Sequence, residues 1–341
     1  MRGKRIIVLA TVALAAAVTV TGLVSAGSAA PKQDKVKVTL VSDIGRFNDK
    51  SFNQLQLEGA LKAKKDFGIT LVPRQSNSVA DYIPNLTAGV RNGSQLVMAA
   101  GFLLAPTTAK VAAKFPDTQF SIMDYGVNVP PFKGNKNVTG LVFPTEQAGC
   151  LVGYMAGLML KTKWADKPQV VGAVGGIKIP SVDNWIAGYR YCAKLANKKL
   201  KVLVGYSQDF VKSDLCKAVA EDQISKGAQV LFQVAGGCGL GTLKAADDAG
   251  IWGIGVDKDQ YNDAKRVLTS GVKRVDTATY LAIKAVVDGQ PLGGTDLVFT
   301  LANKGQAVGR TNPVVPKSVR VQVAKIQAQI IAGKIKPPAK L

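Results

Sequence analysis

The sequence has 341 residues, of which 47% are hydrophobic, enough for two domains that each bury a core. It carries 44 Lys and Arg against 23 Asp and Glu, a formal net charge of +21, and it contains no histidine. The absence of histidine excludes Ser-His-Asp and Cys-His triads and the usual histidine-containing zinc sites, whereas a hydrolase that uses a pair of carboxylates remains allowed.

The basic residues are spread along the chain, without interleaved aromatic residues or a nucleic-acid-binding motif. We therefore expect a solvated basic surface, attracted to anionic envelope polymers or lipid head groups, and no nucleic-acid partner.

The first thirty residues have the pattern of a secretory signal. A basic start, "MRGKR", precedes an apolar run at residues 6–24, and the small residues of "SAGSAA" follow. We expect residues 1–30 to be removed and the mature protein to act outside the cytoplasm. Because the apolar run is long for a signal, an uncleaved membrane anchor is the alternative.

Short apolar, β-branched runs then alternate with amphipathic helical patterns. Strands are predicted at residues 36–42, 69–72, 95–100, 119–124, 138–143, 169–174, 200–205, 229–234 and 251–256. This alternation predicts an α/β protein with parallel sheets that are covered on both faces by helices.

Two such sheets predict two lobes with a cleft between them. We expect the N-terminal lobe to hold residues 36–143 and about 258–300, and the C-terminal lobe to hold residues 144–257 and about 301–335.

Four cysteines in an exported chain favour two disulfides, for which three connectivities exist. We predict Cys150–Cys192 and Cys216–Cys238, because each pair falls within one predicted domain. Metal binding is disfavoured, since the sequence has neither a CxxC motif nor a histidine.

The stretch "DIGRFNDKSFNQ", residues 43–54, connects the first strand to a helix. Ser51 and Gln54 match a capping box, so the loop is expected to end at a helix N-terminus. Ligands of open α/β sheets bind beyond the carboxyl ends of the strands, which is where this loop lies. We interpret Asp49 and Ser51 as capping residues, and Asp43, Phe52 and Asn53 as groups that suit a planar, hydrogen-bonding ligand.

Other strand ends repeat this combination of acidic, glycine and aromatic residues. The candidates are Gly101 and Phe102 in "AAGFLL", Asp124 in "SIMDY", Trp185 in the helix after a Gly-Gly turn, Gly236 in "QVAGGCGLG", Asp257 in "GIGVDKDQ", and Ser270 and Lys273 in "LTSGVKR".

These segments resemble the basic membrane protein family of substrate-binding proteins for ABC importers, which includes purine-nucleoside receptors. The resemblance covers nearly all of residues 36–335 and rests on "DIGRFNDKSFNQLQLEG", "GFLL", "FPDTQFSIMDY", "VTGLVFPTEQAGCLVGYMAG", "VGGIKIPSVDNWIAGY", "FQVAGGCGLG", "GIGVDKDQ" and "LTSGVKRVD". It implies the type I periplasmic-binding fold, two doubly wound lobes joined by a multi-strand hinge.

The resemblance also implies roles for individual residues. The assignments are Phe52 as the stacking residue of the first lobe with Asp43 and Asn53 beside it, Trp185 as its counterpart in the second lobe, Asp124 at the base edge, Gly236 and Asp257 at the ribose, and Lys273 as their cationic partner. It further implies a monomer that is not an enzyme and needs no cofactor or metal, a nucleoside-like ligand, and an ABC permease as partner. Many relatives carry a lipid-modified cysteine at the signal cleavage site; "LVSAGSAA" has none, so a lipid anchor is not expected.

Three alternatives stay open at this point. In the first, the protein is a receptor for another flat heterocycle such as riboflavin, as Trp185 suggests. In the second, it is a secreted hydrolase that uses the carboxylates of Asp43 and Asp49. In the third, it is a sensor that regulates a membrane protein.

Overall fold

The computed structural model describes residues 35–290 and 292–341, and the predicted signal segment lies outside them. Within this range strands and helices alternate along most of the chain. The strands are β1 (Lys37–Val41), β2 (Thr70–Arg74), β3 (Leu96–Ala99), β4 (Gln119–Met123), β5 (Val138–Val142), β6 (Val170–Gly175), β7 (Lys201–Tyr206), β8 (Val230–Val234), β9 (Trp252–Asp257), β10 (Val267–Lys273), β11 (Asp296–Val298) and β12 (Gln306–Val308). The helices are α1 (Phe52–Phe67), α2 (Tyr82–Arg91), α3 (Ala105–Lys114), α4 (Glu146–Lys161), α5 (Pro180–Ala196), α6 (Ser213–Ser225), α7 (Gly239–Asp248), α8 (Val275–Val287) and α9 (Lys317–Ile331), with single 3₁₀ turns at Val79–Asp81 and Phe102–Leu104.

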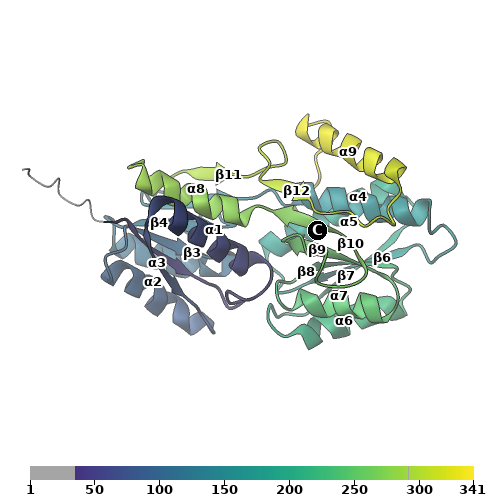
Figure 1. The fold of residues 1–341 in the computed structure, drawn as a ribbon, viewed down its shortest axis with the longest axis horizontal. Coiled ribbons are helices and arrows are strands. Elements are labelled where there is room, and N and C mark those ends of the chain that lie inside the picture. The colour runs from purple at the N-terminus through teal and green to yellow at the C-terminus, as the bar shows by residue number, and fades with distance from the viewer. Residues whose placement is uncertain (1–34, 291) are drawn as a thin grey trace, which may run out of the picture. The chain divides into compact units, whose positions relative to one another are not determined.

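The strands form two six-stranded sheets, each of which is the centre of one lobe (Figure 1). The first sheet has the order β11-β5-β4-β3-β1-β2 and the second has the order β12-β10-β9-β8-β6-β7. Neighbouring strands are parallel except for β12, which runs antiparallel to β10. The predicted α/β class with parallel sheets is confirmed.

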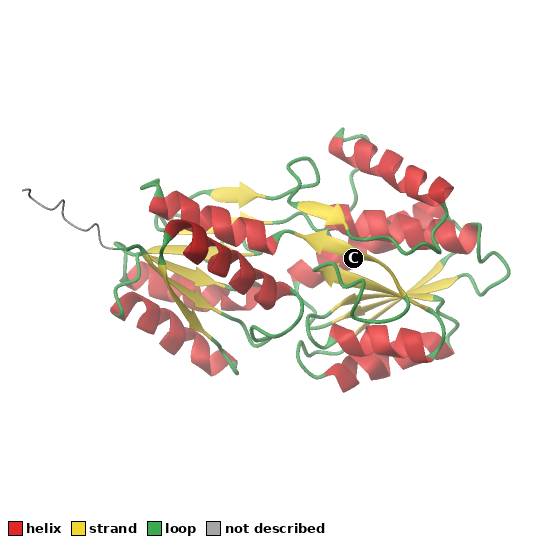
Figure 2. Cartoon of the chain, in the orientation of Figure 1, coloured by secondary structure: helices red, strands yellow, loops and turns green. Residues whose placement is uncertain are grey.

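Helices cover both faces of each sheet, which is why the central strands are apolar on both sides (Figure 2). In the first lobe, residues of α1 and α8 pack on one face and residues of α2 and α3 on the other. In the second lobe, α4, α5 and α9 cover one face, and α6 and α7 cover the opposite one.

The boundary between the lobes differs from the prediction in one place. The chain was expected to return to the first lobe at about residue 258, but β10 still belongs to the second sheet, beside β9. It crosses only after Lys273, where α8 begins to pack against α1. The cause is the connection at 258–266, which contains no helix, so the strand–helix alternation used for the prediction fails there.

Gln306 holds together the connections between the lobes. Its Nε2 donates to the carbonyl oxygens of Pro144 (3.0 Å) and Phe299 (3.0 Å), and its Oε1 accepts from the Ala148 amide at 3.2 Å. The rings of Phe143 and Phe299 stack beside it, with centroids 4.9 Å apart. These contacts hold the connection after β5 next to the connection between β11 and β12.

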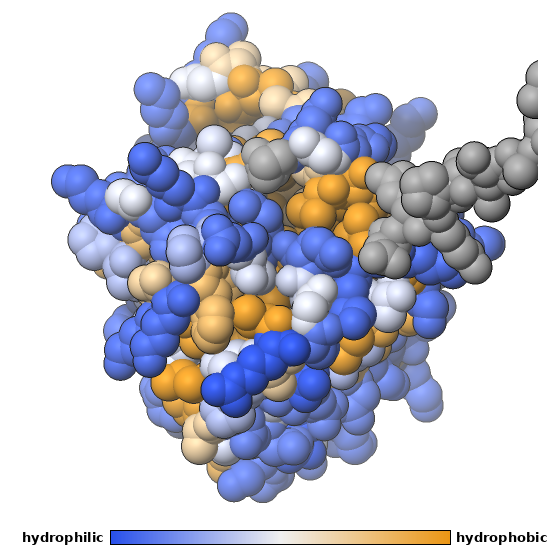
Figure 3. Space-filling model, turned by 90° about the vertical axis from the view of Figure 1, so that its left-hand side faces the viewer, coloured by the Kyte–Doolittle hydropathy of each residue, from blue (hydrophilic) through white to orange (hydrophobic). Residues whose placement is uncertain are grey.

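The surface of the first lobe is largely hydrophilic in the view of Figure 3, with apolar residues in separate areas. Among the described residues, we find no helix whose length and apolar character suffice to span a membrane.

Both predicted disulfides are confirmed. Cys150–Cys192 joins α4 to α5, and Cys216–Cys238 joins α6 to the residue before α7. The first of them lies in a tight helix pair, in which Gly149, Gly153 and Gly157 of α4 lie directly against the backbone of α5. A Cβ atom at Gly153 would collide with the carbonyl group of Tyr189.

We expect Gly153→Ala to lower the free energy of unfolding by roughly 1–3 kcal/mol, because the helices must separate to admit the methyl group. Urea denaturation measures the change, with Lys194→Ala, an exposed site on α5, as the control. Equal stability of the two variants would contradict the close helix packing.

Candidate functional site

A pocket lies where the carboxyl ends of strands from both sheets meet. Its empty space is about 560 Å³, a volume that includes the part open to solvent. All ten residues proposed as ligand-binding line it: Asp43, Phe52, Asn53, Gly101, Phe102, Asp124, Trp185, Gly236, Asp257 and Lys273. Ser270 does not line the pocket, and its hydroxyl accepts a hydrogen bond from the Gln260 amide at 3.0 Å.

Asp49 caps helix α1. One carboxylate oxygen accepts from the amides of Ser51 (2.9 Å) and Gln54 (3.1 Å), and the other accepts from the Asn53 amide (2.8 Å) and from Asn53 Nδ2 (3.1 Å). The predicted role of Asp49 is confirmed, but the capping box is wrong. The hydroxyl of Ser51 donates instead to Asp257 Oδ2 at 2.9 Å, and Gln54 Nε2 donates to Glu58.

Asp43 accepts hydrogen bonds from its own loop and from helix α1. Its Oδ1 accepts from the Gly45 amide and from Asn53 Nδ2, both at 2.7 Å. Asn53 thereby joins Asp43 to Asp49. Because both Asp49 oxygens already accept two hydrogen bonds each, Asp49 has no free position from which to take a proton, and the arrangement does not suit a pair of catalytic carboxylates.

Asp124 and Asp257 occupy equivalent positions in the two lobes, at the ends of β4 and β9. Both have left-handed backbone conformations, with φ of 63° and 61°, which non-glycine residues rarely adopt. Such strain collects at functional sites, where the surrounding structure compensates for it. Here it turns each carboxyl group toward the shared pocket.

Lys273 at the end of β10 bridges the lobes. Its ammonium group lies 2.6 Å from Asp124 Oδ2, and the two side chains are only 2% and 9% exposed. The same nitrogen lies 4.6 Å from the centroid of the Phe52 ring, a cation–π contact. Lys273 therefore both neutralises a buried acid and fixes one of the aromatic residues.

The Phe52 ring is further held by Gly101. A Cβ atom at Gly101 would lie 3.0 Å from the ring and 3.5 Å from Asp43 Oδ2, and Gly101 has a φ of 104°. Glycine is thus required both by the backbone conformation and by the space between the ring and the acid.

The aromatic side chains of the second lobe are not equally accessible. Trp185 lines the pocket but is 2% exposed, and it packs edge-on against Phe232 and beside Gly271. Phe210, in the loop after β7, lines the same pocket and is only half-buried. Phe210 was not predicted, because it lies four residues after the end of β7, whereas candidates were sought directly at strand ends.

Other lining residues were also not predicted as ligand-binding. They are Gly45, Asp49, Leu103, Ile179, Ser181, Val182, Val234, Ala235 and Val256. Most are apolar or small and carry no signal that distinguishes them from core residues.

Burial raises the pKa of several carboxyl groups in the pocket. Desolvation raises the pKa of Asp43 to about 7, although hydrogen bonds from Asn53 and Gly45 act to lower it. Desolvation likewise raises the pKa of Asp257 to about 6, although the positive charge of Lys273 acts to lower it. Desolvation also raises the pKa of Asp49. Near neutral pH the Asp43 carboxyl is therefore partly protonated and can both donate and accept hydrogen bonds, whereas Asp257 is mostly ionised and accepts them.

Comparison with solved structures identifies the class of the fold. The chain superimposes on an ABC transporter system solute-binding protein from Aeropyrum pernix K1 with a TM-score of 0.81 and 25% identity, covering 89% of this chain and 94% of that one. A second solute-binding protein, from Conexibacter woesei, gives a TM-score of 0.68 at 25% identity, covering 89% and 99%. The fold is the type I periplasmic-binding fold.

Sequence comparison gives the family. A model described as ABC transporter substrate-binding protein PnrA-like matches residues 35–340, so the chain belongs to this family of substrate-binding proteins, which are not enzymes. It is 30% identical to the ABC transporter nucleoside-binding protein BmpA of Lactococcus lactis, covering 99% of both chains. It is 33% identical to the CD4+ T-cell-stimulating antigen of Listeria monocytogenes, covering 89% of this chain and 88% of that relative.

The raised pKa of Asp43 predicts a pH dependence of stability. In the unfolded chain the carboxyl ionises near its ordinary value of about 3.9, whereas the folded protein keeps the proton up to about pH 7. The unfolded state thus binds fewer protons between these values, and the contribution of Asp43 to stability falls as the pH rises.

Between pH 5 and pH 8, we expect the free energy of unfolding of the wild type to fall by roughly 3 kcal/mol more than that of Asp43→Asn, since the amide does not ionise. Urea denaturation at the two pH values measures this, with Asp117→Asn, at an exposed carboxyl, as the control. Parallel profiles for wild type and Asp43→Asn would show that Asp43 ionises normally.

Proposed function

We propose that this protein captures a nucleoside outside the cytoplasm and delivers it to the permease of an ABC importer. The observation that carries the proposal is the convergence, in one pocket, of aromatic rings and acidic groups from both lobes. A flat base needs ring faces, and its edge and ribose need groups that donate and accept hydrogen bonds. The relative named a nucleoside-binding protein, which matches along nearly the whole chain, supports the same ligand class.

The expected energies fit a receptor. Stacking of a base on an aromatic side chain contributes about 1–3 kcal/mol, and a hydrogen bond to a charged group about 1.5–3 kcal/mol. Two rings and a few such hydrogen bonds supply the ~8 kcal/mol that micromolar affinity requires.

We assign Phe52 to one face of the base and Asp43 and Asn53 to positions beside it. For the opposite face, Trp185 was the residue expected from the sequence. Because the Trp185 ring is almost fully buried against Phe232, we infer that Phe210 provides most of the second stacking surface, with Trp185 behind it.

The polar side of the ligand is assigned to residues at strand ends. Asp124 accepts from the base edge, while Gly236 and Asp257, with Lys273 as their cationic partner, bind the ribose. Gly101 and Phe102 complete the wall of the first lobe. Movement of the lobes around the ligand would present a changed surface to a membrane permease.

Isothermal titration with purine and pyrimidine nucleosides tests the ligand class. We expect binding in the micromolar range or tighter for at least one of them. Binding of riboflavin without any nucleoside, or a different heterocycle identified by mass spectrometry in the purified protein, would replace the nucleoside by another flat ligand.

Substitutions separate the roles of the aromatic residues. We expect Phe52→Ala and Phe210→Ala each to weaken nucleoside binding by roughly 5- to 150-fold, the equivalent of one stacking contact. Trp185→Phe is expected to change the affinity less, since the ring lies largely in the core. Titration calorimetry measures all three, with Tyr191→Ala, at an exposed ring on α5, as the control. A large loss in Trp185→Phe with none in Phe210→Ala would assign the second stacking surface to Trp185.

A further inference from the structure

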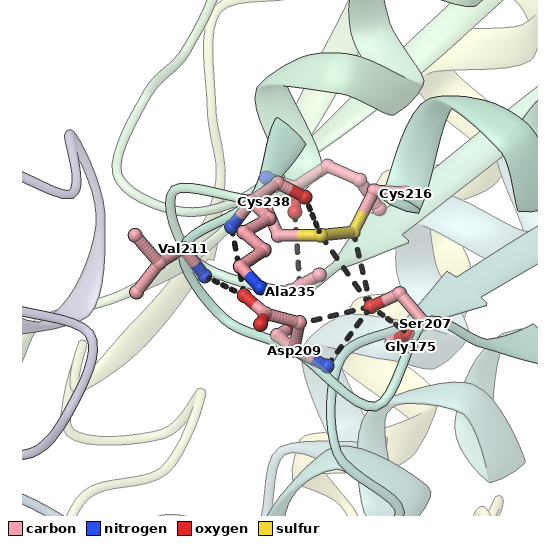
Figure 4. The surroundings of a disulfide bond; sticks show 9 residues. Gly175, Ser207, Asp209, Val211, Cys216, Ala235 and Cys238 are labelled. Atoms are coloured by element: carbon pink, nitrogen blue, oxygen red, sulfur yellow. Dashed lines mark hydrogen bonds between the residues drawn. A yellow bond between two sulfur atoms is a disulfide. The ribbon is translucent and has the colours of Figure 1, made fainter. Parts of the chain in front are cut away.

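The loop that carries Phe210, residues 207–212 between β7 and α6, lies against the Cys216–Cys238 disulfide at its start and end, and in its middle it is hydrogen-bonded to the main chain of Cys238 (Figure 4). The hydroxyl oxygen of Ser207 lies 3.2 Å from Cys216 Sγ and 3.4 Å from Cys238 Sγ. The Cys238 amide donates to the Phe210 carbonyl oxygen at 3.0 Å. Cys238 Sγ lies 3.0 Å from the Lys212 carbonyl oxygen.

The other hydrogen bonds of this loop are mostly internal. Asp209 Oδ1 accepts from the amides of Val211 (2.6 Å) and Lys212 (2.7 Å), as Figure 4 shows in part. Outside the loop, the amides of Ser207 and Gln208 donate to the carbonyl oxygens of Gly175 (2.9 Å) and Gly176 (3.2 Å), at the end of β6. The Phe210 ring also lies against Gly176, where a Cβ atom would collide with the ring. From Asp209 to Val211, the hydrogen bond that joins the loop to the rest of the second lobe is the one from the Cys238 amide.

The disulfide also fixes the neighbouring wall of the pocket. Gly236 and Gly237 immediately precede Cys238, and Gly236 lines the pocket with a left-handed φ of 54°. A Cβ atom at Gly237 would lie 3.4 Å from the Phe210 carbonyl oxygen and 3.6 Å from Asp49 Cα. The glycine turn is therefore enclosed between the Phe210 loop and the first lobe, and its end is anchored by Cys238.

We propose that the Cys216–Cys238 disulfide is a positioning element of the ligand site, which holds Phe210 and Gly236 in place so that affinity depends on the oxidised state. The ligand part of this statement rests on the proposed function. None of the four cysteines lines the pocket, but Cys238 lies two residues after the pocket residue Gly236, whereas the Cys150–Cys192 disulfide joins the α4–α5 pair.

The chemistry is a thiol–disulfide exchange. A dithiol reductant transfers two electrons and two protons to the pair, the Cys216–Cys238 bond breaks, and the dithiol becomes a disulfide. Both cysteines are fully buried, so the reductant reaches them only when the Phe210 loop opens. The receptor is then tight in an oxidising compartment outside the cytoplasm and weak in a reducing one.

The test compares Cys216→Ala/Cys238→Ala with Cys150→Ala/Cys192→Ala, two pairs that each remove one buried disulfide. Amide hydrogen exchange, measured without ligand, is expected to accelerate at the amides of residues 211, 212 and 238 in the first variant only. Guanosine affinity, measured by titration calorimetry, is expected to fall about tenfold in the first variant and to stay within about twofold of wild type in the second.

Unchanged exchange in the Phe210 loop, or an equal loss of affinity in both variants, would overturn the proposal. Should wild type bind no nucleoside, the proposed function fails, whereas the exchange comparison still tests the positioning of the loop. If Cys216→Ala/Cys238→Ala does not fold, Cys150→Ala/Cys192→Ala is measured before and after reduction with dithiothreitol and after reoxidation, with loss and recovery of guanosine binding as the expected result.

Discussion

The pairing of Lys273 with Asp124 is the interaction on which the site depends. Among the pocket-lining residues in the described chain, Lys273 is the one cation, and it shares the pocket with the carboxyl groups of Asp43, Asp49, Asp124 and Asp257. It comes from the second sheet and Asp124 from the first, so the ion pair also links the two lobes. Removing one member of a buried pair leaves the other charge uncompensated, which is strongly destabilising.

The remaining acids are accommodated in different ways. Asp49 is occupied by the amides of α1, and Asp43 and Asp257 retain protons to higher pH because they are buried. The result is a site with many hydrogen-bonding groups and more acidic than basic side chains. Such a site favours a neutral, polar ligand over an anion, which agrees with a nucleoside and disfavours a phosphorylated nucleotide.

Much of the fold and of the site was predictable from the sequence, for a topological reason. The nine predicted strands all occur, because continuous apolar runs between helical patterns define strands covered on both faces. Residues at the carboxyl ends of parallel strands must meet at one edge of a sheet, so Asp43 and Asp124 converge in the first lobe although they are far apart in the sequence. Asp257 lies at the corresponding edge of the second sheet, and the pocket brings the two edges together.

The features that were missed depend on tertiary contacts. Strand β10 follows a connection without a helix, and β11 and β12 have only three residues each, so their periodicity is too short to recognise. Ser51 has the sequence of a cap, but Asp49 reaches the free amides and Asp257 binds the serine hydroxyl across the lobes. Phe210 reaches the pocket from a loop attached to the Cys216–Cys238 disulfide, which no local pattern reveals.

A crystal structure of the protein with a bound purine nucleoside tests the central claim most directly. The account predicts a base lying against the Phe52 ring, with a ring of the second lobe on its other face and the carboxyl groups of Asp124 and Asp257 bound to its polar atoms. A nucleoside bound outside this pocket, or inside it without contact to Phe52, would contradict the account.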